Sequence, residues 1–424
     1  MKLPGTLLLA CCAAAAVRLA PIAPGHARNS INATIFCQPV VSRGDTQYAA
    51  LYDAEGYVVL ARRRLGAARW EVRRTQYTGN IKDAHNGIAL GVDGNGVLHM
   101  SWDHHGHPLR YVQSVRRGSL ELTGKMPMTG TTESRVTYPE FFPLPDGGLL
   151  FLYRDGGSGR GNTILKRYDH RARRWSSVQE LLIDGQGARN AYTNRIAIGR
   201  EGAWHLSWVW RERGDASTNH DICYARSDDQ GKTWRKSTGE AYRLPITVET
   251  AEVVHEVPVK SDLINTGTMA LDSRGKPLIA TYWRPPGAEA PQYHLVWFDG
   301  AQWRVNQVGR RNAPFQLSGG GTRSIPLSRP LVLVGRRDEV YVIFRAEDRS
   351  NGVSVAISED PERAKWRVED LTTESLDRWE PTHDALVWER QRKLHLFHQR
   401  VGQGEGDTWA DLPPQMVSVL EWEP

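Results

Sequence analysis

Cysteine is scarce in this sequence, which limits how the chain can be stabilised. The chain has four cysteines in 424 residues, and two of them, Cys11 and Cys12, lie in the apolar N-terminal stretch. Only Cys37 and Cys223 remain for the rest of the chain. One disulfide is the most that this pair can form, so a small fold stapled by several disulfides is excluded.

Long apolar runs are also lacking beyond the N-terminus. The first residues read MKLPGTLLLACCAAAAVRLAPIAPGHA, with Lys2 before an apolar stretch and small residues at the end. This pattern is typical of a secretory signal peptide, which we expect to be cut after Ala27. The letters LLAC before Cys11 form a weaker lipobox, so lipid anchoring is a second interpretation. No later segment approaches the about 20 apolar residues of a membrane helix, which predicts a secreted or periplasmic protein without a membrane span.

Tracts of one charge are missing as well. The formal net charge is +6, and removing the expected signal peptide leaves about +4, a mild bias toward anionic partners. No basic helix or long Lys/Arg tract occurs, so nucleic acid is not the expected partner. We expect a monomer that binds an anionic polymer.

Amphipathic helical patterns are nearly absent, and short alternating strands take their place. Five short segments open with a lone Trp, at Trp70, Trp175, Trp234, Trp303 and Trp366. Between them, seven segments pair a turn with an alternating apolar strand, beginning at Asp53, Asp93, Pro145, Arg200, Ser273, Arg336 and Arg390. Two hairpins per unit make a four-stranded blade, and such repeats indicate a β-propeller.

The sequence therefore predicts an all-β fold, a seven-bladed β-propeller with blades of four antiparallel strands. Residues 28–424 would form this single domain after the signal peptide of residues 1–27. A β-sandwich is the alternative, but seven similar hairpins exceed what a sandwich holds. Residues 227–234, SDDQGKTW, fit the Asp-box pattern S-x-D-x-G-x-T-W. We interpret this box as structural, a hairpin turn whose Trp packs between strands.

Four histidines crowd into residues 99–107, HMSWDHHGH. The preceding strand starts at His85, and a turn at residues 93–96 joins the two strands. If Val92 faces Val97, His85 lies opposite His104, and a one-residue bulge makes the partner His105 instead. A zinc site, a solvated loop and a catalytic or binding rim are the three interpretations. We favour the rim, because His85 converges from a separate strand.

Arginines occupy the matching ends of other hairpins. If the hairpins are equivalent, these strand ends share one rim of the propeller, where loops on a rigid scaffold carry function. The alternative for Arg154 is a salt bridge to Asp155 or a neighbouring acid. The residues that we expect to bind substrate are His104, Arg211, Arg284 and Arg323.

Several stretches resemble a known family. The segments AHNGIALGVDGNGVLHMSWDHHGHPLRY, TYPEFFPLPDGGLLFLYRDGGSGRGNTILKRYD, NAYTNRIAI and NHDICYARSDDQGKTW are similar to the propeller-type ulvan lyases and the related rhamnose–glucuronate-cleaving propellers. The likeness runs from about residue 80 to about residue 300. It implies a seven-bladed propeller that cleaves by β-elimination at a uronic acid. The family's functional residues map onto His85, His105, Tyr138, Arg154 and Tyr192, and His205 is the candidate for a further histidine.

These residue types suit a uronate lyase. Such an enzyme removes the C5 proton and expels the oxygen at C4, so the neighbouring carboxylate must first be neutralised. Arg154 offers a fixed bidentate cation for that carboxylate. A neutral His or a Tyr of lowered pKa is suited to take the proton, and Tyr138 or Tyr192 to protonate the leaving oxygen. The residues leave these assignments open, and no cofactor is required if Arg154 supplies the charge.

A separate structural zinc site is a further expectation. His220 and Cys223 stand close together in NHDIC, and His294 lies in the following repeat. Imidazole and thiolate ligands suit zinc. The alternative is a buried cysteine with two hydrogen-bonded histidines.

The sequence thus predicts a secreted polysaccharide lyase that acts on an ulvan-like, rhamnose–glucuronate polysaccharide. One alternative is an exo-acting lyase or hydrolase on arabinogalactan-type side chains. A sialidase fits poorly, because only one good Asp box is present. A non-catalytic glycan-binding propeller is the alternative from another class of protein.

Overall fold

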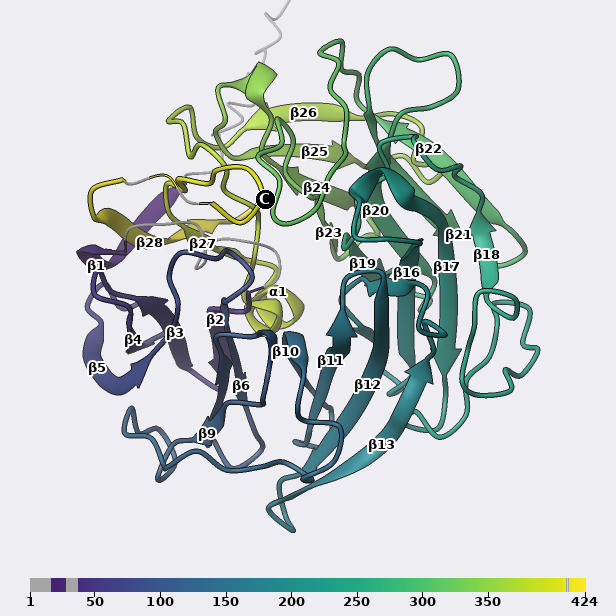
Figure 1. Ribbon diagram of the computed structural model, residues 1–424. Coiled ribbons are helices and arrows are strands. Elements are labelled where there is room, and N and C mark those ends of the chain that lie inside the picture. The colour runs from purple at the N-terminus through teal and green to yellow at the C-terminus, as the bar shows by residue number, and fades with distance from the viewer. Residues whose placement is uncertain (1–16, 28–36, 409, 411) are drawn as a thin grey trace, which may run out of the picture.

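The computed structural model describes residues 17–27, 37–408, 410 and 412–424. Within these ranges the fold is all-β, with one α-helix, α1 (Ala385–Gln391), and two short 3-10 turns, Ala216–Thr218 and Glu347–Arg349. The sheets stand around a common centre, as the blades of a propeller do (Figure 1). The predicted fold class is confirmed at this level.

The antiparallel sheets follow one another along the chain. The first holds β2 (Val40–Arg43), β3 (Thr46–Tyr52), β4 (Tyr57–Arg64) and β5 (Glu71–Thr78). The next holds β6 (Ile88–Val92), β7 (Leu98–Trp102) and β9 (Tyr111–Gln113). A ten-stranded sheet contains β8 (His105–His107), β10 (Val136–Pro143), β11 (Leu149–Gly157), β12 (Arg160–Asp169), β13 (Arg174–Ile183), β14 (Asn190–Thr193), β15 (Ala197–Ile198), β16 (Trp204–Arg211), β17 (Asn219–Ser227) and β18 (Glu252–His255).

Three further sheets complete the arrangement. The first of them holds β19 (Thr268–Leu271), β20 (Pro277–Trp283), β21 (Gln292–Phe298) and β22 (Trp303–Val308). The second holds β23 (Leu331–Val334), β24 (Val340–Phe344), β25 (Ser354–Ser358) and β26 (Arg367–Asp370). The last joins β27 (Leu394–His398) and β28 (Gln415–Trp422) to the N-terminal strand β1 (Arg18–Ala27).

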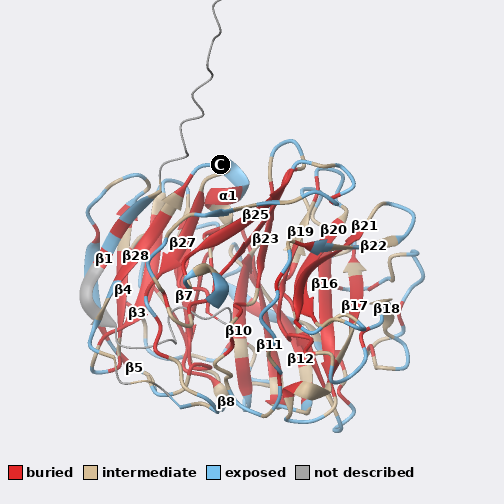
Figure 2. Ribbon diagram, turned by 90° about the horizontal axis from the view of Figure 1, so that it is seen from above, coloured by how far each residue is buried: buried red, intermediate tan, exposed pale blue. Residues whose placement is uncertain are grey.

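Each inner strand buries both of its faces, because a sheet lies on either side of it. In β3, Ala49 and Leu51 pack into one apolar cluster, while Tyr48 and Ala50 pack into the next. Successive side chains of a strand point to opposite faces of the sheet, so one strand contributes to two cores. Figure 2 shows the result, with buried strands through the middle of the molecule and exposed turns at its edges.

The Asp box forms the predicted turn between β17 and the next segment. The Asp229 carboxylate accepts a hydrogen bond from the backbone N–H of Thr233 at 2.9 Å. Trp234 is fully buried, and its Nε1 donates to the carbonyl oxygen of Gly231 at 3.1 Å. Gly231 has a φ of +84°, and a Cβ there would meet the Trp204 ring at 2.6 Å. The structural interpretation of the box is confirmed.

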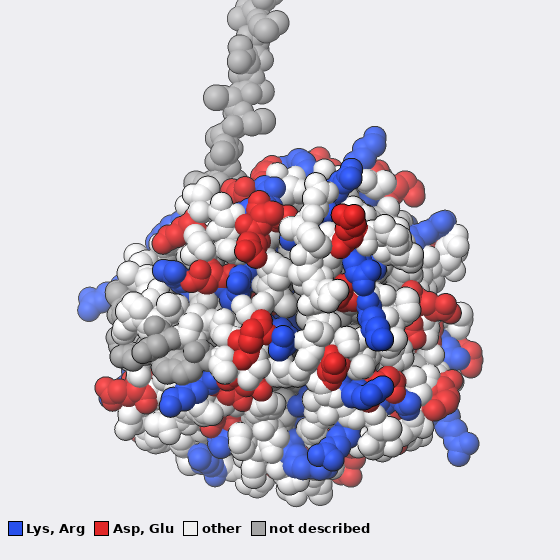
Figure 3. Space-filling view, turned by 45° about the horizontal axis from the view of Figure 1, so that its top comes forward, with Lys and Arg blue, Asp and Glu red and all other residues white. Residues whose placement is uncertain are grey.

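The N-terminal part of the chain departs from the expected boundary. Residues 1–16 of the expected signal peptide lie outside the described residues, but Arg18–Ala27 form β1, which pairs with β28. A cut after Ala27 would therefore remove a strand of the sheet. No described helix is both long and apolar enough to span a membrane. Acidic and basic side chains are interspersed on the face shown in Figure 3.

Candidate active site

The five side chains that the resemblance singled out line one pocket. These are His85, His105, Tyr138, Arg154 and Tyr192, and the prediction that they share a pocket is confirmed. The pocket is completed by residues from the middle and last parts of the chain, including Ser158, Arg211, Asn265, Thr322, Arg323, Arg329 and Asp407.

The register of the β6–β7 hairpin decides which histidine faces His85. Val92 pairs with Leu98 rather than with Val97, because the turn between the strands holds five residues. Counting outward in this register brings His85 opposite His105, and their rings stack with centroids 3.9 Å apart. The register in which Val92 faces Val97 and His85 faces His104 is therefore wrong by one residue, and the bulged alternative with His105 is confirmed.

His104 turns away from the pocket. Its side chain is fully buried, and its Nε2 accepts a hydrogen bond from the backbone N–H of Arg110 at 2.8 Å. Burial lowers the pKa of His104 well below its usual value, so the ring is neutral. The prediction that His104 binds substrate is therefore wrong, and its role is to hold the backbone of the loop.

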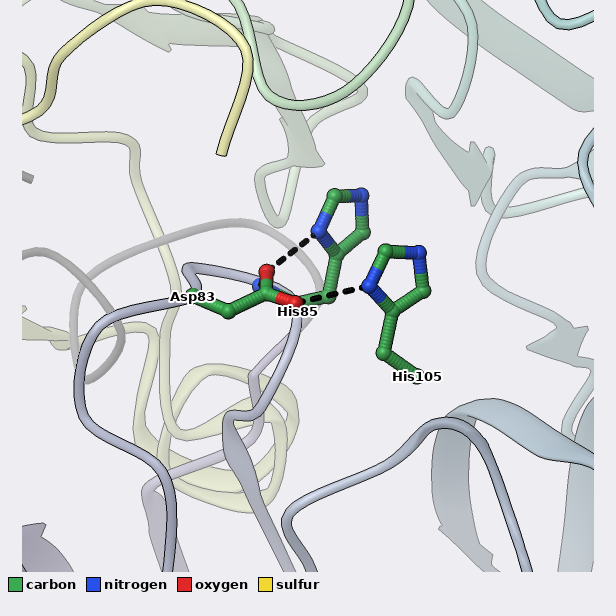
Figure 4. Close-up of side chains that lie close together, drawn as sticks. All are labelled: Asp83, His85 and His105. Carbon is green, nitrogen blue, oxygen red and sulfur yellow. Dashed lines mark hydrogen bonds and ion pairs between the residues drawn. The ribbon is translucent and has the colours of Figure 1, made fainter. Parts of the chain in front are cut away.

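One carboxylate, Asp83, holds both histidines of the pocket. Its Oδ1 lies 2.7 Å from Nδ1 of His85, and its Oδ2 lies 2.7 Å from Nδ1 of His105. The backbone N–H of His85 donates to the same Oδ1 at 2.9 Å. Figure 4 shows that the other ring nitrogens point away from this carboxylate. Asp83 therefore fixes which nitrogen of each ring remains for a ligand.

A second carboxylate reaches His85 from the C-terminal part of the chain. Oδ1 of Asp407 lies 3.2 Å from Nδ1 of His85. Burial opposes the charged imidazole, but hydrogen bonds to Asp407 and Asp83 outweigh it and raise the pKa of His85. Burial would likewise raise the pKa of Asp83, but its bonds to His105 and His85 hold that pKa well below the usual range. His85 is therefore suited to carry a positive charge.

Asp83, His85 and His105 are also residue types that could bind a metal ion. Among the described residues, Asp83, His85 and His105 form the group whose candidate ligand atoms all lie within 4.8 Å of one another. The hydrogen bonds that both rings donate to the Asp83 carboxylate account for that closeness.

Tyr138 enters the pocket from an irregular point of β10. The register against β11 shifts between Thr137 and Glu140, and Tyr138 has a φ of +55°. A bulky residue with positive φ is strained, and such strain clusters at functional sites. The Tyr138 ring lies 5.7 Å from the His85 ring and 4.8 Å from the Arg154 guanidinium carbon. Burial raises the pKa of Tyr138, so its phenol stays protonated.

Arg154 and Arg211 bring two buried positive charges into the pocket. Each residue is 6% exposed. Arg211 donates to the side-chain oxygens of Asn219 at 2.7 Å and Asn265 at 2.6 Å, both of which are neutral. No carboxylate among the described residues forms an ion pair with either guanidinium, and Nε of Arg154 has no hydrogen-bond partner there.

The predicted alternative for Arg154, a salt bridge to Asp155 or a neighbouring acid, does not form among the described residues. Asp155 instead lies 3.4 Å from the exposed Arg135. Buried charges are normally paired. The pocket therefore has two guanidinium groups whose charge an anionic ligand would compensate.

Tyr192 lies between these two arginines. Its hydroxyl oxygen is 3.3 Å from Nη1 of Arg154, 3.1 Å from Nη1 of Arg211 and 2.8 Å from the hydroxyl of Ser158. Burial alone would raise its pKa, but Arg211 and Arg154 outweigh burial and lower the pKa of Tyr192 to about 8. Tyr192 can therefore ionise near neutral pH.

Of the other predicted residues, Arg323 lies in the pocket, whereas Arg284 and His205 do not. Arg323 lines the pocket and lies 2.7 Å from Glu405. Arg284 is not among the lining residues, because its Nε bonds to Asp262 at 2.7 Å. His205, the candidate for a further histidine, is buried elsewhere, with Nδ1 2.6 Å from the Tyr224 hydroxyl.

Sequence reasoning missed three charged residues of the site, Asp83, Arg329 and Asp407. Arg329 lines the pocket, donates to the carbonyl oxygen of Asn265 at 2.8 Å and pairs with Glu380 at 2.8 Å. A local signal existed only for Asp83, which stands two residues before His85.

The structure does not bring the predicted zinc ligands His220, Cys223 and His294 together. His220 lies between Glu212 at 2.9 Å and Asp221 at 3.0 Å. Cys223 packs into the apolar cluster that holds three buried Trp of β16, and it is not joined to Cys37 in a disulfide. His294 stacks on Trp283 at 3.6 Å.

Strand alternation explains this correction of the zinc prediction. Ile222 and Tyr224, the neighbours of Cys223, face the sheet that carries His294. Cys223 must then face the opposite side of β17. The alternative to a zinc site therefore holds, because Cys223 is buried among apolar side chains, His220 is hydrogen-bonded and His294 is stacked on a Trp.

Curated relatives match part of the chain. An ulvan lyase, long isoform, from Alteromonas sp is 28% identical over 230 aligned residues, and the match covers 41% of this chain and 22% of that protein. The ulvan lyase, long isoform, of Pseudoalteromonas sp. (strain PLSV) is 25% identical over 226 residues, again 41% and 22%. The match thus spans about a fifth of the length of these relatives.

Solved structures share the fold over most of the chain. An ulvan lyase from a new family of polysaccharide lyases superposes with a TM-score of 0.67 at 15% identity, covering 83% of this chain and 86% of that one. Another polysaccharide lyase superposes with a TM-score of 0.65 at 17% identity, covering 91% and 89%. At these identities the likeness establishes the fold.

A sequence profile of a protein family matches a longer part of the chain than these curated relatives do. The profile described as "BNR repeat-containing family member" matches residues 46–311, which include all five pocket residues that the resemblance singled out. Because this match extends over more than half of the chain, the protein belongs to the BNR repeat-containing family.

Proposed function

We propose that the protein is a polysaccharide lyase that cleaves a uronic-acid-containing, ulvan-like polysaccharide by β-elimination. The observation that carries this proposal is the pair of buried guanidinium groups, Arg154 and Arg211, which have no carboxylate partner among the described residues and flank the ionisable Tyr192. The relatives named ulvan lyase support it, and one solved ulvan lyase is described as bound to a GlcA(1-4)Rha3S unit.

The propeller that carries the site has seven blades in this proposal. The ten-stranded sheet divides naturally into β8 with β10–β13 and β14–β18, since the described strands of these two groups pair with each other only at Gly161 and Asn190. Dividing it there leaves seven groups of neighbouring antiparallel strands, as the seven hairpins of the sequence predict. The domain acts as a monomer outside the cytoplasm.

Neutralisation of the uronate carboxylate is the first chemical requirement. The proton on C5 is weakly acidic because the adjacent carboxylate is already negative. Two fixed guanidinium groups that bind this carboxylate would stabilise the enolate-like charge that develops as the proton leaves. Arg154 and Arg211 hold this position, and a protonated His85 lines the same pocket.

Proton transfer then falls to the two tyrosines. Their rings lie 6.1 Å apart, so ionisation of one disfavours ionisation of the other. Tyr192, between two arginines, ionises first and takes the C5 proton in this proposal. Tyr138 stays protonated and donates to the leaving oxygen at C4.

A product assay tests the proposal directly. The protein should be incubated with ulvan, glucuronan, gum arabic and glycosaminoglycans while absorbance near the ultraviolet edge is followed. A lyase gives a 4,5-unsaturated product that absorbs there, whereas a hydrolase gives new reducing ends without it. Binding without any new chain ends would show a glycan-binding protein and overturn the proposal.

Removal of metal ions should leave turnover unchanged. The proposal assigns charge neutralisation to Arg154 and Arg211, so no cofactor is required for catalysis and a structural zinc is not part of the reaction. The measurement is the initial rate on the accepted polysaccharide before and after dialysis against a chelator. A rate that falls and returns on adding zinc would show that a metal does take part.

Replacing Asp83 with asparagine should lower turnover about 10- to 10²-fold, because a displacement of about 1 Å among the side chains that line a catalytic pocket has a cost of that size. Asparagine cannot accept hydrogen bonds from both imidazoles as the carboxylate does. Asp93→Asn is the matched control, since it removes a carboxylate beside a buried imidazole, His99, outside the pocket. Equal rates for the two folded variants would contradict a positioning role for Asp83.

A further inference from the structure

The N-terminal strand β1 lies at the outer edge of the last sheet of the chain. It runs antiparallel to β28, from the pair Arg18 and Glu421 to the pair Ala27 and Gln415, and β27 lies on the other side of β28. Figure 1 shows this strand beside the C-terminal strands. The first and last described strands of the chain thus share one sheet.

The side chains of β1 alternate as those of a packed strand do. Ala20 is 2% exposed and Ile22 is 6% exposed, while Leu19, the residue before Ala20, is 44% exposed. Ile22 packs into the apolar cluster that also contains Val417 and Val419 of β28. Arg18 adds an ion pair with Glu421 at 3.8 Å.

Loss of β1 would leave the last sheet incomplete. The backbone N–H and C=O groups of β28 that now pair with β1 would form an open edge, which native proteins avoid. The contact of Ile22 with its apolar cluster would also be lost. A leader that extended to Ala27 would therefore be removed at the expense of the fold.

We propose that the leader peptide is cut between Ala16 and Val17, and that residues 17–27 stay in the exported protein as the strand that completes its last sheet. A signal peptidase would hydrolyse this peptide bond with one water molecule, leaving a carboxylate on Ala16 and an amine on Val17. The sequence supplies small residues, Ala14 and Ala16, at the −3 and −1 positions that such cleavage requires. Gly25 and Ala27 offer a second small pair, so the structure rather than the motif distinguishes the two sites.

The N-terminus of the exported protein tests the proposal. The full chain should be expressed in a bacterium that exports it, recovered from outside the cytoplasm, and characterised by intact mass and N-terminal sequencing. We expect a chain that begins at Val17. A chain that begins at Arg28, at Met1 or at a lipid-modified Cys11 would overturn the proposed site.

Two substitutions within β1 test whether the strand is retained and packed. In the full exported chain, Ile22→Asp should lower Tm by at least about 5 °C, because it places a carboxylate in an apolar cluster. Leu19→Asp is the matched control on the exposed face of the same strand and should leave Tm unchanged. Equal Tm values for both variants and the parent protein would show that β1 is absent or unpaired. If Ile22→Asp is not recovered, the N-terminal sequence of the parent protein still decides.

Discussion

Replacing Arg154 with alanine should lower turnover on a uronate polysaccharide at least about 10²-fold, because one preorganised donor to developing charge is typically worth about 3 kcal/mol. The Arg154 guanidinium is buried and has no carboxylate partner among the described residues. Arg154→Lys should recover little of the rate, since a point charge lacks the planar fork that binds both oxygens of a carboxylate. The measurement is kcat and KM from the absorbance of the unsaturated product.

A neutral substrate sharpens this experiment. When the uronate is methyl-esterified, there is no carboxylate charge to neutralise, so the difference between the parent protein and Arg154→Ala should shrink. Arg284→Ala is the matched control, because Arg284 pairs with Asp262 and does not line the pocket. Near-normal turnover of folded Arg154→Ala on the charged substrate would refute the role that we assign to this residue.

The parts of the fold that repeat along the chain could be predicted from sequence, because each hairpin carries its own turn and its own alternation. The turn between β6 and β7 is an example, since its Asp and Gly residues placed both strands correctly to within one residue. That single residue decided between His104 and His105. A turn of five residues instead of four moves every later side chain to a new partner.

Contacts between distant loops could not be predicted in this way. Asp407 reaches His85 across more than 300 positions of sequence, and no local pattern marks either end of such a contact. The zinc prediction failed for a related reason. Residue type and position in consecutive repeats suggested Cys223 and His294 as ligands of one metal ion. Whether two such side chains meet depends on the face of the strand on which each lies.

The N-terminal boundary shows a different limit. An apolar stretch rich in Ala and Pro reads equally as the end of a signal peptide or as a buried strand. Only the pairing of Arg18–Ala27 with β28 distinguishes the two, and the partner strand lies about 400 residues away. Local composition is therefore insufficient where the first and last strands of a chain share one sheet.

Replacing Tyr192 with phenylalanine should lower turnover about 10²- to 10⁴-fold, as expected for loss of a general base. The hydroxyl of Tyr192 bonds to Arg154, Arg211 and Ser158 in the pocket, and a phenyl ring keeps the packing while removing this oxygen. Tyr293→Phe is the matched control, because Tyr293 is equally buried and its hydroxyl donates to the carbonyl of Ser328 outside the pocket.

The pH dependence of kcat/KM identifies the base independently of this substitution. A base acts only when deprotonated, so activity should rise with pH through the pKa of Tyr192, which the two arginines lower to about 8. Arg211→Gln removes one of these charges and should shift the rising limb to higher pH, since the tyrosinate loses a stabilising partner. The same substitution in a protein whose base is a histidine would leave the limb near the pKa of that imidazole. A rising limb that Arg211→Gln does not move, together with substantial activity in Tyr192→Phe, would transfer the role of base from Tyr192 to the stacked histidines.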